Sequence, residues 1–468
     1  MNPYFSLGLV ILCCASAYSG SALSRDLPGQ HADLLGVYQS AALNDAQLSA
    51  ARHAYQAQRE AVPQARAGLL PNLTAGATSE VTRLERDEPA LSRERSGTTF
   101  RANLNQPLFR IDRWFQLKAA QSSVSQAELE LSAKEQTLVL TAAQAYFETL
   151  RQLDGFAAAQ AEETALLRQR DQAQGRLEDG ASSITDVYDA QAAYDNARAN
   201  RQQVQRRVDD AYEALERLTK HTYTSIAGMG HQLPVEAPVP NDARAWVDTA
   251  VRQNLELQAS EHAVSAAEQT LNQRKAGHAP TIDAVASYRK GDNDSFGYSN
   301  PTDFGSNGYR EKVAQSSIGI ELSIPLYSGG MTNSQIKEST ERLYQSQDEQ
   351  EDRRREVVLN TRNAFRGINA GIEQITARRQ SIVSGQKSVE ANQVGVDVGS
   401  RNIADVLNAQ RQLYAAVRDY NDARYDYILD NLRLKQAAGT LGPDDLKALA
   451  LYLKQDYDPA RDFLPPGL

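Results

Sequence analysis

Cysteine is almost absent from this 468-residue chain, and both of its cysteines lie near the N-terminus. Cys13 and Cys14 fall within a short apolar core, Leu7 to Ala17, which is too short to cross a membrane as a helix. Small residues follow this core, as at the cleavage site of a secretory signal peptide. Cleavage is predicted after Ala17 or Ala22, and residues 1–22 are assigned to the signal peptide. The mature chain would then hold no thiol, which excludes disulfides and thiolate chemistry.

Long apolar runs and clustered metal ligands are also missing. Beyond residue 25 there is no apolar run of 18 residues, so no membrane-spanning helix is predicted. The formal net charge of −9 disfavours non-specific binding to nucleic acid. The six histidines are scattered without the spacing of metal ligands, and no Ser-His-Asp arrangement is apparent. We therefore expect no metal or other cofactor and no enzymatic activity.

Two sequence elements occur twice, in the same order. A Gly-x-x-Pro element reaches its proline at Pro71 and again at Pro280, which is 209 positions later. A Gly-x-x-x-Ile-x-Asp-Val element starts at Gly180 and again at Gly399, which is 219 positions later. Two elements repeated at similar offsets indicate a duplicated unit of roughly 200 residues, which is too long for a solenoid repeat.

Each half shows the same order of predicted structure. A helical stretch ends at the Gly-x-x-Pro element, two segments of period-two alternation follow as strands, and two helices complete the half. Polar loops separate the strands, from Glu80 to Ser96 and from Gly291 to Glu311. The predicted strands are residues 71–80, 99–108, 280–290 and 316–326, and the predicted long helices are residues 112–178, 184–219, 332–397 and 403–438.

These elements divide the mature chain into two repeats with two connecting parts. The first repeat spans residues 23–219, and a linker covers residues 220–242. The second repeat spans residues 243–438, and residues 439–468 form a C-terminal segment. The linker and the C-terminal segment are each predicted to be equatorial segments of the molecule.

The predicted helices are unusually long and carry a coiled-coil pattern. About 65 residues at a rise of 1.5 Å give a rod of about 100 Å, which does not fit inside a compact domain. The returning helix of the second half spaces its seam residues by alternating steps of three and four, as in a coiled coil. The seam residues are Ile403, Val406, Gln410, Leu413, Val417 and Tyr420.

Four strands are too few to close a barrel. The open edges of such a sheet cannot face lipid, because their backbone N–H and C=O groups would have no hydrogen-bond partner. If these strands lie in a membrane, several chains must therefore share one barrel, with the polar loops outside and the helices projecting inward. A structural periplasmic coiled coil, which would need no barrel, is the alternative from another functional class.

The repeated elements resemble one known family. The segment from Gly399 to Gln410, followed by the stretch from Asn421 to Leu441, resembles the C-terminal helix of the TolC family. The segment Gln136 to Phe147 is similar to the same family in the first half, and Leu326 to Met331 resembles its strand-to-helix corner. The resemblance covers about residues 30 to 450.

The resemblance implies an α+β membrane protein that works as a homotrimer. Three chains with four strands each would form a 12-stranded β-barrel in the outer membrane of a Gram-negative bacterium, continued by a helical tunnel through the periplasm. Such a duct would act with a periplasmic adaptor (membrane fusion) protein and an inner-membrane ABC or proton-driven transporter. The helix ends resemble the TolC branch most, which favours type I secretion of proteins, while multidrug efflux remains the alternative.

The resemblance also indicates two sets of site residues. The ends of the two helical hairpins match the family's adaptor-contact tips. The competing interpretation is that these residues serve only to build the turns, because glycine permits the reversal and Asp can bond helical N–H groups. These tip residues are Gly180, Ile184, Asp186, Gly399, Ile403 and Asp405.

The second set is a periplasmic gate. Asp171 matches the stretch that holds the family's gate aspartate, and Arg378 falls where the family has a partner tyrosine. An ion pair from Asp171 to Arg378 or Arg379 is therefore predicted to replace the family's contact. Glu390 falls at an acidic constriction, where three copies would repel one another and attract cations. The competing interpretation is that all four are ordinary solvated helix charges.

Overall fold

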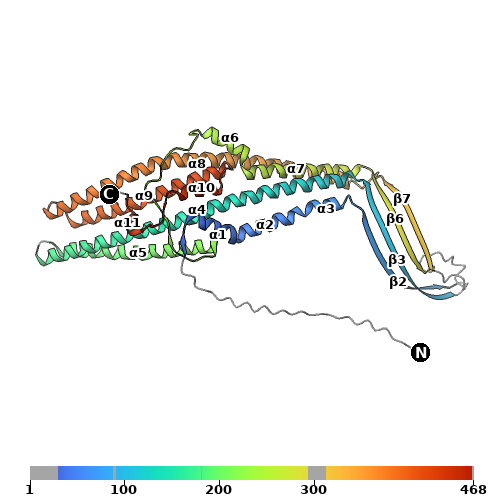
Figure 1. Cartoon of the computed structure of the whole chain (residues 1–468), viewed down its shortest axis with the longest axis horizontal. Helices are drawn as coiled ribbons and strands as arrows, with labels where there is room; N and C mark the ends of the chain where they lie inside the picture. The colour runs from blue at the N-terminus through green and yellow to red at the C-terminus, as the bar shows by residue number, and fades with distance from the viewer. Residues whose placement is uncertain (1–29, 88–90, 181, 293–311, 466–468) are drawn as a thin grey trace, which may run out of the picture.

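The computed structural model describes residues 30–87, 91–180, 182–292 and 312–465. The molecule is elongated: long helices lie side by side over most of its length, and a sheet projects from one end at an angle to them (Figure 1). The predicted signal peptide and both cysteines lie outside the described residues. No helix within the described ranges is both long enough and apolar enough to cross a membrane.

The two repeats contain matching elements. The first repeat has β1 (Gln30–Ala32), α1 (Leu34–Asn44), α2 (Ala46–Arg59), α3 (Ala61–Ala67), β2 (Asn72–Arg86), β3 (Leu91–Phe109), α4 (Ile111–Glu178) and α5 (Ile184–Thr219). The second has α6 (Ala243–Gln253), α7 (Leu255–Lys275), the 3-10 turn η1 (Ala276–His278), β6 (Thr281–Asp292), β7 (Lys312–Ser323), α8 (Met331–Asp397) and α9 (Ile403–Ala437). The linker forms β4 (Tyr223–Ile226) and β5 (Gly228–Met229), and the C-terminal segment forms α10 (Pro443–Ala450), β8 (Leu453–Lys454) and α11 (Pro459–Asp462).

The helical stretch before the strands is interrupted at the same place in both repeats. Asp45 ends α1 and caps α2, because its carboxylate accepts a hydrogen bond from the backbone N–H of Leu48 at 2.6 Å. Asn254 lies between α6 and α7 and accepts from the N–H of Leu257 at 3.0 Å. Each side chain satisfies a helix N-terminus that would otherwise lack a partner, so one short polar residue fixes each break.

The four long strands form one antiparallel sheet in the order β2-β3-β6-β7. The predicted loop from Glu80 to Ser96 is largely wrong, because β2 and β3 stay in register until Arg86 lies opposite Leu91. The charged residues of this segment are typical of a loop, but here they lie within the strands. Arg83 and Glu94 are directly opposite each other, as a cross-strand pair of opposite sign. Most of the second predicted loop lies outside the described residues.

The two faces of the sheet differ in polarity. Alternate residues of a strand point to opposite faces, and the register brings Leu73, Leu104 and Ala286 to one face, which we call the apolar face. Ile318 and Ile320 of β7 lie on the same face and are highly exposed in the single chain. The opposite, polar face carries Asn, Thr, Ser and Gly residues together with charged ones such as Arg101 and Asp283. An exposed apolar band opposite a polar face is typical of a strand between lipid and a pore.

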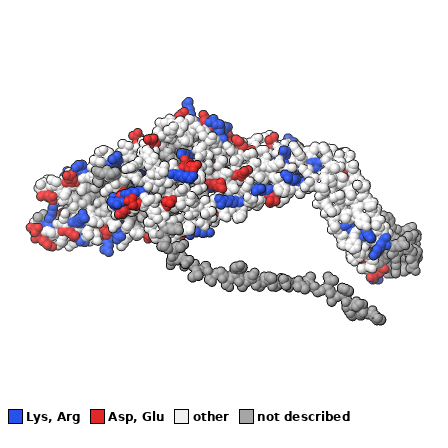
Figure 2. Space-filling view, in the orientation of Figure 1, with Lys and Arg blue, Asp and Glu red and all other residues white. Residues whose placement is uncertain are grey.

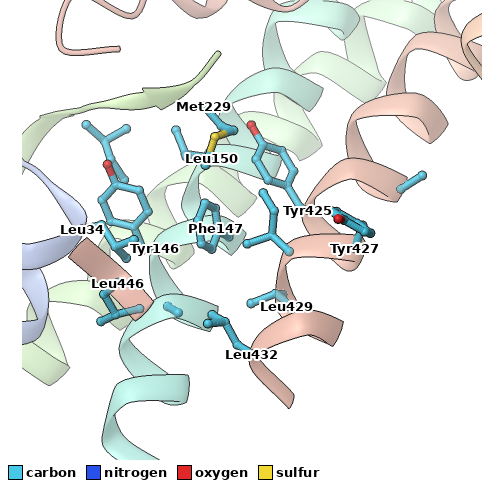
Figure 3. Close-up of a cluster of buried hydrophobic side chains, with 14 of the residues drawn as sticks. Leu34, Tyr146, Phe147, Leu150, Met229, Tyr425, Tyr427, Leu429, Leu432 and Leu446 are labelled. Atoms are coloured by element: carbon cyan, nitrogen blue, oxygen red, sulfur yellow. The ribbon is translucent and has the colours of Figure 1, made fainter. Parts of the chain in front are cut away.

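The main core lies near the middle of the helices, where the linker and the C-terminal segment pack against α4 and α9. Tyr146 and Phe147 of α4 are fully buried beside Tyr425 of α9 (Figure 3). The rings of Tyr146 and Phe147 meet edge to face, with centroids 5.6 Å apart. Burial of each large side chain contributes roughly 2–3 kcal/mol, so this cluster fixes how the two repeats pack together.

A buried carboxylate joins three parts of the chain in this core. Asp154 of α4 accepts hydrogen bonds from the hydroxyls of Tyr425, at 2.7 Å, and of Tyr457 in the C-terminal segment. Burial raises the pKa of Asp154 to about 6, while the hydrogen bonds from the two tyrosines act in the opposite direction. The C-terminal segment is therefore fastened to α4 through a buried carboxyl whose pKa is raised above the usual value for aspartate.

Candidate functional site

Two helical hairpins, α4–α5 and α8–α9, end side by side at the end of the molecule opposite the sheet (Figure 1). We call residues 178–186 the first tip and residues 397–405 the second tip. Each tip reverses the chain at a glycine in the left-handed region, with φ of 70° at Gly180 and 72° at Gly399. Glycine lacks the Cβ that makes this conformation costly, so the predicted turns have a direct physical cause.

Each tip then starts its returning helix with the same capping arrangement. The side chain of Ser183 accepts from the N–H of Asp186, and Asp186 accepts from the N–H of Ser183. Asn402 and Asp405 make the reciprocal pair in the second tip. The hydrogen bond from the Ser183 backbone lowers the pKa of the Asp186 carboxyl. Both aspartates therefore help to build the turns, and their contact with an adaptor stays a prediction.

The isoleucines of the two tips have different surroundings. Ile184 is 52% exposed, whereas Ile403 is 5% exposed. Ile403 and Leu407 belong to a buried cluster with Leu166 and Ala173 of α4. The second tip is therefore packed against the first hairpin, and the first tip presents an apolar side chain to its surroundings.

Polar contacts connect the two hairpins close to the tips. Arg176 of α4 donates to the carboxylate of Asp397 of α8. Seven residues before Arg176, Gln169 of α4 donates from Nε2 to Oε1 of Gln393 of α8 at 3.0 Å. We call these two contacts the tip links. None of the four residues was predicted from the sequence, although Arg176 and Asp397 precede the two tip glycines by four and two positions with opposite charge.

Further contacts between the hairpins lie nearer the core. Arg418 of α9 donates to Glu162 of α4 at 3.3 Å, and burial raises the pKa of Glu162. Arg151 of α4 donates to Asp426 of α9 at 2.6 Å, and Asp422 lies 3.7 Å from the same guanidinium. Of these acidic partners only Glu162 is largely shielded from solvent, whereas the Arg151–Asp426 pair is about as exposed as the Arg176–Asp397 pair.

The structure gives the predicted gate residues other partners within the chain. Asp171 pairs with its neighbour Arg170, and Arg378 pairs with Asp419 of α9 at 2.9 Å. An ion pair from Asp171 to Arg378 is therefore not formed in the single chain. Arg379 is exposed on α8.

Glu390, the predicted constriction residue, is exposed on α8 and pairs with Lys387 at 2.9 Å. The hydrogen bond from this lysine lowers the pKa of Glu390. The role of Glu390 at a constriction stays a prediction. The described part of the chain has no group of three or more His, Cys, Asp or Glu residues that could hold a metal ion.

Comparison with known proteins agrees with this architecture. A family model described as outer membrane efflux protein matches residues 37–220 and again residues 246–440. The two matched stretches correspond closely to the two repeats that the sequence predicts.

Individual relatives match along most of the chain. The outer membrane protein TolC of Vibrio cholerae is 34% identical over 424 residues, covering 90% of this chain and 94% of the relative. The alkaline protease secretion protein AprF of Pseudomonas aeruginosa is 28% identical over 436 residues, covering 92% and 89%. Among solved structures, a crystal structure of CusC aligns with a TM-score of 0.75 at 16% identity, over 90% of this chain and 96% of that one.

Proposed function

This chain belongs to the TolC family of outer membrane efflux proteins, and from that premise we propose that three copies form one exit duct of a tripartite export system. It is a non-enzymatic channel protein of the Gram-negative outer membrane, with the TolC-like fold that the sequence predicts. Family membership sets aside the alternative of a purely structural coiled coil.

The proposal of a trimer rests on the two edge strands of the sheet. In one chain β2 and β7 are the edge strands, and each has a row of backbone groups that no other described strand pairs. Lipid cannot hydrogen-bond such groups, whereas β7 of one chain paired with β2 of the next would satisfy them. Three chains with four strands each close a 12-stranded barrel, whose outer surface is the apolar face. The long helices then continue the pore into the periplasm.

The cargo that we favour is protein in type I secretion. The support is the similarity to AprF, since the name of that relative states a role in the secretion of a protease. A channel of this kind takes its cargo from its transporter, so the same duct would also serve a drug transporter. Multidrug efflux is therefore the second candidate. We expect a chromosomal deletion to abolish secretion of a protein that an ABC exporter carries. Normal secretion together with increased sensitivity to detergents and dyes would favour efflux instead.

We propose that the first tip contacts the adaptor protein through Ile184 and the turn at Gly180. The exposed apolar side chain of Ile184 supports this assignment, since a partner could bury it. Asp186 and Asp405 would hold the tips in shape. In the second tip, Ile403 is already buried against α4 and α5, so that tip would contact the adaptor through the backbone and polar groups near Gly399.

We propose further that the tip links keep the gate closed at rest. An exposed ion pair contributes only about 0–1 kcal/mol, which suits a contact that must break when the gate opens. The Arg176–Asp397 pair and the Gln169–Gln393 hydrogen bond join the hairpins at the ends that are farthest from the core. The predicted link from Asp171 to Arg378 would need a neighbouring chain or a rearrangement, so we place it second.

The duct itself is tested by extraction and electrophysiology. We expect the protein in the outer-membrane fraction as a trimer that resists SDS until heated, and we expect stable channels of low conductance when it is added to a planar lipid bilayer. A protein recovered only in the soluble periplasmic fraction, without channel activity, would contradict the proposal.

A further inference from the structure

The exposed apolar band of the sheet continues to the corner where the strands join the helices. Leu322 of the apolar face is exposed, and so are Leu326 and Tyr327 in the connection from β7 to α8. On the first turn of α4, Trp114 is 48% exposed. In the proposed trimer this band lies in lipid, so its end at the corner marks the level of the lipid headgroups. Tryptophan and tyrosine are enriched at that level.

Two lysines are exposed at the same corner. Lys118, one turn beyond Trp114 on α4, has its Nζ 5.3 Å from the centre of the Trp114 ring. Lys275 is the last residue of α7, six positions before β6 begins at Thr281. Neither lysine has a hydrogen-bond or ion-pair partner among the described residues. Both ammonium groups are therefore available to a ligand.

Trp114 and the two lysines project from the same side of the helix layer. α4 starts at the corner and α7 ends there, so the two helices run antiparallel (Figure 1). The hydroxyls of Ser122 and Ser265 are 3.1 Å apart and mark the sides by which the helices face each other. Trp114 lies eight residues before Ser122, and Lys275 lies ten residues after Ser265. At 3.6 residues per turn, both are turned by about 80° from the contact in the same sense, and the twofold relation of antiparallel helices brings them to one side.

This side is the outer one in the proposed trimer. Leu150 follows Trp114, and Asp154 follows Lys118, by 36 residues or about ten turns of α4. Both are buried where the linker and the C-terminal segment pack against α4, and Asp154 accepts a hydrogen bond from Tyr457. A closed ring of helices has room for such additional segments only on its outside, because its inside is the pore. Trp114 and the two lysines therefore face away from the lumen.

The acidic residues around the corner leave the lysines unpaired. Asp112, two residues before Trp114, accepts two hydrogen bonds from Arg110 at 3.1 Å and lies on the other side of α4. On the side of the lysines, the first acidic residue of α7 is Glu268, seven residues or about 10 Å farther from the sheet than Lys275. Within the described ranges Glu268 forms no ion pair.

The charge of the helix surface changes with distance from the sheet. From Leu255 to Gln273, α7 carries three acidic residues and neither Lys nor Arg, but it ends with two basic residues. From Arg113 to Ala127, α4 has no acidic residue, and Glu128 follows. Figure 2 shows Lys and Arg on the helices directly beside the sheet, next to an uncharged stretch of the sheet. Basic residues that border a lipid-facing surface attract anionic headgroups.

We propose that Trp114, Lys118 and Lys275 form a binding site for the phosphate of phospholipids in the inner leaflet of the outer membrane. This inference rests on the proposed trimer, in which the apolar face lies in lipid. The two ammonium groups bind the phosphate with charge-assisted hydrogen bonds, and their apolar stems lie along the helices. The indole of Trp114 lies beside the start of the acyl chains. The site fixes the depth of the barrel and prefers anionic lipid over zwitterionic lipid.

The test uses Trp114 as the reporter. The chain has two tryptophans, so Trp246→Phe leaves Trp114 as the only one. Trimers of this variant are placed in phosphatidylcholine bilayers that contain brominated phosphatidylglycerol or brominated phosphatidylcholine, and quenching of the fluorescence is measured. Brominated phosphatidylglycerol should reach half of the maximal quenching at a mole fraction at least about threefold lower, because the two lysines attract its headgroup.

In the same background, Lys118→Gln with Lys275→Gln should remove this preference. The matched control is Lys134→Gln with Lys447→Gln, which makes the same change of net charge on α4 and α10 farther from the sheet and should keep the preference. Glu268→Gln should increase it. Native mass spectrometry of trimers that retain both tryptophans gives a second measurement, since phosphatidylglycerol should stay bound longer than phosphatidylcholine and should do so only with both lysines present.

Equal quenching by the two lipids, or an equal preference with and without the two lysines, would overturn the headgroup site. Absence of quenching by either lipid in intact trimers would also overturn it, because protein would then cover this side of the helices. Failure of the unaltered chain to form SDS-resistant trimers would instead overturn the proposed duct, so the two failures are distinguishable.

Discussion

The two hairpin tips share one turn design but differ in what surrounds it. Both reverse at a left-handed glycine and start the next helix with a reciprocal capping pair. The second tip buries Ile403 against the first hairpin, whereas the first tip leaves Ile184 exposed. The duplicated sequence therefore preserves the local turn, while the tertiary packing makes the two copies differ. One tip holds the hairpins together, and the other is free to face a partner.

The largest contrast is expected between the two isoleucines. Ile403→Ala should cost roughly 2–5 kcal/mol, because it leaves a cavity in the cluster with Leu166 and Ala173. Ile184→Ala should change stability little and weaken binding of the adaptor. Thermal melting and adaptor pull-down measure the two effects. A similar loss of stability in both variants would remove the difference between the tips.

A second contrast concerns two acidic residues that lie 26 positions before the tip glycines. Asp154 in α4 is buried, and Glu373 in α8 is exposed. The folded-state pKa of Asp154 is raised to about 6 from 3.8. Its contribution to stability is therefore complete below pH 4 and is lost as the pH rises through 6, by on the order of 3 kcal/mol.

Asp154→Asn should remove this part of the pH dependence, and Glu373→Gln, its matched control, should not. Apparent melting temperatures at several values between pH 4.5 and 8 report the slope. If the slope of melting temperature against pH is the same in Asp154→Asn and the wild type, the Asp154 carboxyl stays ionised across this range and its pKa is not raised.

The capping pairs should behave alike, in contrast to the isoleucines. Ser183→Ala and Asn402→Ala each remove an N-cap acceptor, so each should cost about 1 kcal/mol. Similar decreases in melting temperature for both variants would show that the two capping pairs stabilise their helices equally. A large effect at only one position would mean that the two turns differ in more than their packing.

The smallest effect on stability is expected at the tip links. Arg176→Ser with Asp397→Ser removes an exposed ion pair, which costs about 0–1 kcal/mol. The same double variant should raise single-channel conductance, because the hairpin ends separate more easily. Asp171→Ala with Arg378→Ala is the matched comparison and should raise it less. A larger rise in conductance in that second variant would favour the predicted Asp171–Arg378 gate over the tip links.

Local signals made much of this architecture predictable. Proline, glycine and the heptad steps are features of short segments, so they indicated the duplication, the long helices and the turns at Gly180 and Gly399. The family resemblance and the TolC-like fold are confirmed. The β2–β3 hairpin was predicted too short because charged residues such as Arg83 and Glu94 were interpreted as a loop. In the structure they pair across the strands instead.

Contacts between distant helices were not predictable in the same way. Arg176 and Asp397 are 221 positions apart, and their contact depends on how two long helices are rotated about their axes. Charges on a helix surface do not reveal which charge of another helix they meet. The same limit applies to the predicted Asp171–Arg378 pair, which the single chain does not form. A motif position places a residue along a helix but does not give its partner.

The central claim is that one chain supplies a third of a pore. Native mass spectrometry of the protein extracted from outer membranes in mild detergent tests it most directly. The predicted result is a particle of three chains that forms channels in a lipid bilayer. A particle of one chain, with β2 and β7 left as open edges and no channel activity, would contradict it.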